Sequence, residues 1–178
     1  MLTKKTFLAA FAAGLMVFGA QGALAATEGV ELMDAENDIY NQASLQRGAR
    51  NYMAYCSGCH SIKYMRYSRM AADLKIPEQQ LEQHLLLPGD SKNDYILTRL
   101  QPADGESWFG KAPPDLSLIT RAKGSDYVYQ FLKTFYADPK STNGTNNLAL
   151  PGTAMPHVLS SLQGVQTAKF SESEIGRA

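Results

Sequence analysis

The sequence of 178 residues predicts one all-α domain, built from short helices and long irregular loops. Apolar residues recur at helical spacing in several short segments, and no segment shows the alternation of a half-buried strand. Hydrophobic residues make up 44% and charged residues 19%, which excludes a disordered chain and a protein with many membrane spans. The balance of 17 basic and 17 acidic residues excludes nucleic-acid binding through bulk positive charge.

Residues 1–25 have the pattern of a secretory signal peptide. Lys4 and Lys5 precede an apolar stretch, and residues 23–25 read Ala-Leu-Ala, which is an A-x-A cleavage site. The alternative is an uncleaved membrane anchor, for which a span needs about 20 apolar residues. Cleavage leaves residues 26–178 as the mature domain, with 15 basic residues against 17 acidic ones. Export also places its cysteines in an oxidising compartment.

The first expected helices lie in the N-terminal half of the mature domain. One covers about residues 45–56, where Ser44 can cap the helix and the apolar side chains share one face. A second covers about residues 67–74. A third begins at Pro77, a favourable residue for the first turn, and continues to about Leu87.

The last expected helix covers about residues 126–136, with Ser125 as its cap and an apolar stripe at i, i+3, i+4 and i+7. Residues 88–123 and 137–157 are rich in proline and glycine, which indicates loops. Loops of this length are uncommon in a compact domain unless they carry a function. We therefore expect a large apolar cofactor to supply part of the core.

The segment Cys56-Ser57-Gly58-Cys59-His60 has the pattern C-x-x-C-H, which attaches c-type haem. Two thiols about one helical turn apart can both reach the vinyl groups of a porphyrin, and the next residue can place its imidazole on the iron. The motif therefore predicts one covalently bound haem c.

The motif has three other interpretations. A disulfide between Cys56 and Cys59 would close a loop too small to stabilise the chain much. A thioredoxin-like redox pair needs a βαβ setting, and no strand is expected before the motif. A zinc site needs about four ligands, and the histidines are only His60, His84 and His157.

Met155 is the favoured sixth ligand of the iron. It lies in a loop bracketed by Pro151 and Pro156, and such a stiff loop can cross the opposite face of the haem. A methionine and histidine pair raises the reduction potential relative to two histidines. His157 is the rival ligand. Met53 lies on the helix that leads into the motif and is not expected to reach the opposite face, whereas Met65 and Met70 are better explained as packing residues.

Arg121, Lys123 and Tyr127 form a further polar group near the start of the last helix. Buried haem propionates need donors, and arginine donates to carboxylates in bidentate fashion. From the residues alone, an ordinary solvated helix start explains the group equally well.

The chain resembles the cytochrome c1 family, the haem subunits of the ubiquinol–cytochrome c oxidoreductase, or cytochrome bc, complex. The resemblance covers nearly all of the mature chain, and it depends on more than the attachment motif. Its segments are Tyr55-Cys56-Ser57-Gly58-Cys59-His60-Ser61, Ala112-Pro113-Pro114-Asp115-Leu116-Ser117, Ile119-Thr120-Arg121-Ala122, Asp126-Tyr127-Val128 and Ala154-Met155-Pro156.

The resemblance implies an all-α cytochrome c-type haem domain with long inserted loops, and it implies a role for seven residues. These are Cys56 and Cys59 as covalent attachments, His60 and Met155 as axial metal ligands, Arg121 and Tyr127 near the propionates, and Pro114 packed near the haem.

The resemblance also implies partners and a location. The partners are cytochrome b, a Rieske-type iron–sulfur subunit and a soluble cytochrome c-type acceptor, at the periplasmic face of a bacterial inner membrane. Members of the family end in a transmembrane helix, whereas no apolar run follows residue 150 and the sequence stops at Ala178. We therefore expect that a C-terminal membrane anchor is missing from this sequence.

The function expected on this basis is single-electron transfer, without catalysis by the chain alone. The alternative from another class is a haem enzyme, or a gas or redox sensor, with an exchangeable sixth ligand. A stable methionine ligand to the iron distinguishes the first hypothesis from the second.

Overall fold

The computed structural model describes residues 32–169, so the expected signal peptide at residues 1–25 lies outside the described residues. An extended segment leads into helix α2 (Gln42–Asn51), which continues directly as a π-helical turn, η1 (Tyr52–Cys56). The cap of α2 is Asn41, whose side chain accepts a hydrogen bond from the backbone N–H of Ser44. The helix therefore begins three residues before the expected position, and Ser44 lies in its first turn.

The first lobe, residues 42–100, contains α2 and a compact apolar core. After the motif come β1 (Ile62–Arg66), α3 (Tyr67–Asp73), α4 (Glu78–His84) and β2 (Tyr95–Ile96). The expected helix at 67–74 is thus present, preceded by a strand that was not expected. The buried side chains of this core come from these elements and the turn after α4: Tyr67, Met70, Ala71, Leu81, Leu85 and Ile96.

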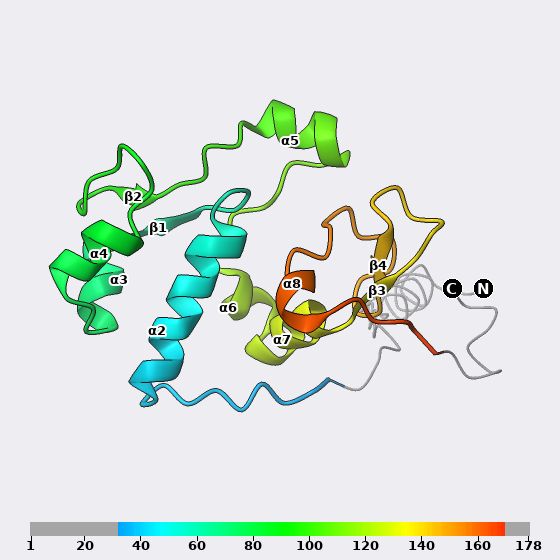
Figure 1. The fold of residues 1–178 in the computed structure, drawn as a ribbon, viewed down its shortest axis with the longest axis horizontal. Helices are drawn as coiled ribbons and strands as arrows, with labels where there is room; N and C mark the ends of the chain where they lie inside the picture. Colours follow the sequence, from blue (N-terminus) through cyan, green and yellow to red (C-terminus); the bar gives the residue numbers. More distant parts are fainter. Residues whose placement is uncertain (1–31, 170–178) are drawn as a thin grey trace, which may run out of the picture.

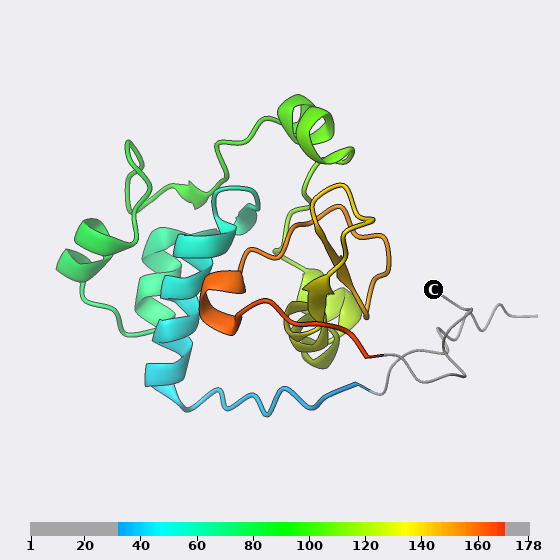
Figure 2. The ribbon, with the colours of Figure 1, turned by 45° about the vertical axis from the view of Figure 1, so that its right-hand side comes forward.

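The second lobe, residues 115–164, holds the remaining elements except α5 (Pro102–Phe109), which lies on the connection between the lobes. In chain order they are α6 (Ile119–Lys123), α7 (Ser125–Lys133), β3 (Phe135–Ala137), β4 (Thr145–Asn147) and α8 (Ser160–Gln163). Figures 1 and 2 show the first lobe on one side and α7 with the β3–β4 hairpin on the other, with α8 between them.

The expectation of an all-α fold is wrong, because the structure contains two small antiparallel sheets. In the first, β1 pairs with β2, and in the second β3 pairs with β4 as a hairpin. Neither β1 nor β4 has alternating polarity: Lys63 and Tyr64 are adjacent and both exposed, and β4 reads Thr-Asn-Asn. These strands are defined by pairing between segments, which periodicity within one segment cannot reveal.

The region 88–123 is also more regular than expected, since it holds β2, α5 and α6. Helix α5 begins with Pro102 at its first position and ends at Gly110, which has a left-handed backbone (φ 73°). These are a proline and a glycine in the positions that begin and end helices, and not signs of a loop. No helix within residues 32–169 has the length and apolar character to cross a membrane.

Candidate functional site

A cavity of about 240 Å³ lies between the two lobes and is lined almost entirely by apolar atoms. Three segments that are distant in sequence form its wall: the end of η1 with the motif, the last residue of α5 with the chain after it, and the loop between β4 and α8. The lining residues are Tyr55, Cys56, Cys59, His60, Phe109, Lys111, Ala112, Pro113, Pro114, Leu150, Ala154, Met155, Pro156 and Val158. Five of the seven residues predicted from the sequence are therefore brought together in one place.

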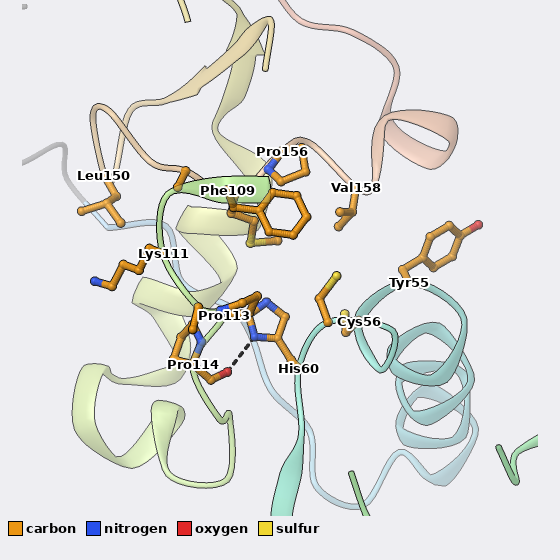
Figure 3. Close-up of a pocket in the computed structure, with 14 residues that line it drawn as sticks. Tyr55, Cys56, His60, Phe109, Lys111, Pro113, Pro114, Leu150, Pro156 and Val158 are labelled. Atoms are coloured by element: carbon orange, nitrogen blue, oxygen red, sulfur yellow. Dashed lines mark hydrogen bonds between the residues drawn. The ribbon is translucent and has the colours of Figure 1, made fainter. Parts of the chain in front are cut away.

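The imidazole of His60 is oriented by a backbone carbonyl. Its Nδ1 lies 2.7 Å from the carbonyl oxygen of Pro114 (Figure 3). A carbonyl can only accept, so Nδ1 is the donor in this contact, which leaves Nε2 as the ring nitrogen available to a metal. This arrangement is the usual outer contact of a metal-binding histidine, because it sets both the tautomer and the ring orientation.

Two hydroxyl groups hold the backbone of the motif. The hydroxyl of Tyr52 donates to the carbonyl of His60 at 2.6 Å, and that of Thr98 donates to the carbonyl of Gly58 at 2.7 Å. Burial, and then the nearby Cys56, raise the pKa of the Tyr52 phenol well above its ordinary range, so this donor keeps its proton. The motif is thereby fastened to both η1 and the segment after β2.

Cys56 and Cys59 are both half-buried free thiols, so no disulfide joins them. Cys56 lies in the last turn of η1, and the backbone N–H groups of Cys59 and His60 both donate to its carbonyl. Burial, together with the neighbouring Cys59, raises the pKa of the Cys56 thiol. The two thiols and the imidazole therefore lie on one continuous helical turn at the cavity.

The segment that carries Pro114 is fixed on both of its sides. Before it, Gly105 of α5 packs so closely that an added Cβ would lie 2.7 Å from the ring of Pro113. After it, the carboxylate of Asp115 accepts hydrogen bonds from the backbone N–H groups of Lys63 and Ser117 at 2.9 and 3.0 Å. Partial burial acts to raise the pKa of Asp115, but these donors outweigh it and the pKa lies below 3.8.

Met155 lines the cavity, whereas its rival His157 does not. The imidazole of His157 is buried and stacks on Phe135, with ring centroids 5.1 Å apart and planes 6° from parallel. Its Nε2 lies 3.2 Å from the carbonyl of Gly164. The ring therefore packs inside the second lobe, and only the thioether of the two candidate ligands faces the same cavity as His60.

Arg121 and Tyr127 lie outside the lining of this cavity. Arg121 is exposed on α6. Tyr127 on α7 stacks with Phe131 at a centroid distance of 6.5 Å, and the ammonium of Lys123 lies 5.7 Å from the centre of its ring. Their expected contact with haem propionates stays a prediction.

The zinc hypothesis receives no support from the described part of the chain, in which no three His, Cys, Asp or Glu side chains gather as metal ligands. His84 is exposed on α4 and lines a separate groove with Arg47 and Arg50. Phe109, Leu150 and Val158, by contrast, line the haem-motif cavity and were not predicted. They belong to loops or helix ends, where an apolar residue carries no pattern that marks it as part of a wall.

Comparison with known proteins gives a direct match. The model of the cytochrome C1 family matches residues 33–86 and 88–167. The chain belongs to the cytochrome c1 family. Cytochrome c1 of Allochromatium vinosum is 46% identical over 171 residues, which cover 96% of this chain and 68% of that protein.

Two other relatives differ in name and coverage. A protein named ammonia monooxygenase gamma subunit, from Nitrosomonas europaea, is 41% identical over 77% of this chain and 58% of its own length. Cytochrome c1 of Rhodospirillum rubrum is 30% identical over 56% of this chain and 43% of its own. The chain thus spans between about two fifths and two thirds of the length of these relatives.

Cytochrome c1 proteins bind haem c covalently and transfer electrons, and the residues present here fit that group. The donor set is chemically appropriate: two free thiols, an imidazole whose Nδ1 donates to a carbonyl and a thioether all border one apolar cavity. Thioether and imidazole are recognised axial ligands of haem iron. The family therefore explains why so apolar a cavity lies between the two lobes.

Proposed function

We propose that this protein passes single electrons from a Rieske-type iron–sulfur subunit to a soluble cytochrome c-type acceptor, as part of a cytochrome bc complex that also contains cytochrome b. The observation that carries the proposal is the position of His60, Met155 and both free thiols around one apolar cavity. The chain by itself catalyses no bond-making reaction. It is exported and works at the periplasmic face of a bacterial inner membrane.

The roles of the residues follow from their chemistry. Cys56 and Cys59 would hold the haem by thioether bonds, and His60 and Met155 would bind its iron. Pro114 supports His60 through its carbonyl, which accepts the Nδ1 proton. Haem c, when bound, supplies a one-electron couple, and the methionine ligand raises its potential relative to a second histidine. The apolar wall of the cavity would exclude water from the bound group.

The test uses the full chain matured with haem. After denaturing electrophoresis the protein band retains haem, because the attachment is covalent. The ferric protein shows a methionine–iron charge-transfer band, and the ferrous protein binds carbon monoxide poorly. Met155→Ala abolishes the band and admits carbon monoxide, whereas Met33→Ala, a change at an exposed methionine of the extended segment, leaves both properties unchanged.

Two results would contradict the proposal. Loss of haem from the protein band after denaturing electrophoresis would show that the haem is not covalently attached. Rapid carbon monoxide binding by the unaltered ferrous protein, without the charge-transfer band, would favour the enzyme or sensor hypothesis, which needs an exchangeable sixth ligand.

A further inference from the structure

The segment that carries Met155 has no regular secondary structure of its own. This Met155 loop, residues 148–159, connects β4 to α8. A loop of this kind has few internal hydrogen bonds, so its shape depends on what holds its backbone from outside. In this protein the supports come from the β3–β4 hairpin, through three asparagine side chains.

Asn147 holds the start of the Met155 loop. Its Oδ1 accepts from the backbone N–H groups of Ala149 and Leu150, at 2.9 and 3.1 Å. Its Nδ2 donates to the carbonyl of Phe131 in α7 at 2.7 Å. The side chain is fully buried, so it links the loop to the helix inside the second lobe and not at the surface.

Asn146 holds the middle of the loop. Its Oδ1 accepts from the backbone N–H of Gly152 at 2.8 Å, and its Nδ2 donates to the carboxylate of Asp138 at 2.9 Å. Asp138 follows β3, so this contact joins the loop to both strands of the hairpin.

Asn143 reaches the residue next to Met155. Its Oδ1 accepts from both the N–H and the hydroxyl of Thr145, which completes the turn between the strands. Its Nδ2 is not needed for that turn, and it donates to the carbonyl of Ala154 at 3.2 Å. The oxygen of Asn143 therefore serves the hairpin, while its nitrogen serves the loop.

The same hairpin also contacts the chain after Met155. His157 stacks on Phe135, the first residue of β3. The backbone is thus held by the hairpin on both sides of Met155, at Ala154 and at His157. A thioether binds iron weakly, so a ligand of this kind depends on a backbone that keeps it in place.

We infer that Asn143, Asn146 and Asn147 are positioning residues, which hold the Met155 loop so that the thioether stays on the haem iron against competing ligands. This inference rests on the proposed role of Met155 as the sixth ligand. An exogenous ligand must displace the thioether and move the loop, and each hydrogen bond from these asparagines opposes that movement.

The test is the substitution Asn143→Asp in the matured full-length protein. The aspartate keeps an oxygen for the Thr145 donors, but it replaces the donor to Ala154 by a second acceptor. Asn143 is half-buried, so the new carboxylate can remain hydrated. Imidazole, titrated into the ferric protein, measures displacement of the thioether through loss of the charge-transfer band. We expect imidazole to bind about fivefold more tightly, the factor that loss of one hydrogen bond produces.

The matched control is Thr142→Asp, which adds the same charge at the adjacent exposed residue of the turn. It should bind imidazole as the unaltered protein does. Equal affinity in the unaltered protein and Asn143→Asp, or equal tightening in Asn143→Asp and Thr142→Asp, overturns the inference. If Asn143→Asp gives no folded protein, Asn146→Ala replaces it, because it removes the hydrogen bond to Gly152. Imidazole should then bind Asn146→Ala more tightly than the unaltered protein, and equal affinity overturns the inference.

Failure of the proposed ligand set gives a different result. In that case the unaltered protein lacks the charge-transfer band before any imidazole is added. If the band is present and disappears in Met155→Ala, Met155 is the ligand. The asparagine variants then test separately whether the three asparagines position it.

Discussion

Single residues near the cavity act mainly through backbone groups. Pro114 accepts the His60 proton with its carbonyl, and Asp115 holds the next residues by accepting N–H groups from two segments. A proline cannot donate, so its carbonyl is the one backbone hydrogen-bonding group that it offers. Side-chain substitutions at these positions therefore act by moving the backbone that orients His60.

The carboxylate of Asp115 predicts an acid-sensitive contribution to stability. Its pKa in the folded protein lies below the ordinary 3.8, so the ionised form stabilises the fold. That contribution is fully present above pH 3.8 and is lost as the pH falls through the lower folded value. We expect Asp115→Asn to flatten the decline of the free energy of unfolding below pH 3.8, as measured by denaturant titration.

The control for Asp115 is Glu106→Gln, a neutralisation at an exposed position of α5. In this variant the free energy of unfolding should decline with falling pH as it does in the unaltered protein. If the free energy of unfolding of Asp115→Asn declines with acid as steeply as that of the unaltered protein, the N–H donors from Lys63 and Ser117 do not stabilise the ionised carboxylate.

Among the elements, α5 shows how packing overrides helix propensity. Its buried Gly105 lies against the segment that supports His60, and an added Cβ would be 2.7 Å from the Pro113 ring and 3.3 Å from the Cα of Ala112. Both neighbours are rigid, so the backbone of residues 112–114 would have to move. By contrast, Gly48 lies in the interior of α2, and an added Cβ there meets nothing within 4 Å.

These two glycines predict opposite effects of the same substitution. Gly48→Ala should raise the free energy of unfolding by about 0.5–1 kcal/mol, since alanine loses less conformational freedom in a helix. Gly105→Ala has the same advantage in helix propensity, but its added Cβ overpacks the contact with Pro113, which costs about 1–3 kcal/mol. We therefore expect Gly105→Ala to lower the free energy of unfolding. Thermal unfolding of both matured proteins measures the difference. Stabilisation by Gly105→Ala would show that the contact with Pro113 relaxes freely.

At the scale of the whole molecule, the cavity lies between two lobes whose buried interiors differ in composition. The first lobe has its own apolar core around Tyr67, Leu81 and Ile96. The second lobe buries polar groups as well, including Gln130 and Asn147. An apolar wall that faces no ligand loses contacts and stability, so we expect bound haem to strengthen the association of the lobes.

Removal of the haem should therefore loosen the molecule unevenly. In the double variant Cys56→Ser with Cys59→Ser we expect lower hydrogen-exchange protection in residues 109–114 and 148–159. Backbone amides of α3 and α4 should keep most of theirs, because their core does not include the cavity wall. Hydrogen-exchange mass spectrometry of the matured protein and the variant makes the comparison. Equal protection of residues 109–114 and 148–159 in both would contradict a structural role of the haem.

Much of the architecture was predictable where the pattern is local. The helices at Tyr67–Asp73 and Ser125–Lys133 match the expected positions closely. The second has an apolar stripe within one short segment, although Gly124 and not Ser125 is its cap. The strands were not predictable, since β1 and β4 have no alternating polarity and exist through their partners. Helix α5 was missed because Pro102 and Gly110 were interpreted as loop residues and not as a start and a stop.

The sequence alone determined which chemical groups this protein presents together: the spacing of Cys56, Cys59 and His60 keeps two thiols and an imidazole within five consecutive residues. Tertiary structure decided what meets these groups. It brought Pro114 to Nδ1 of His60, turned His157 into the second lobe and left Met155 at the cavity. The physical reason is that spacing governs contacts within a few residues, whereas contacts between distant segments depend on how all the elements pack together.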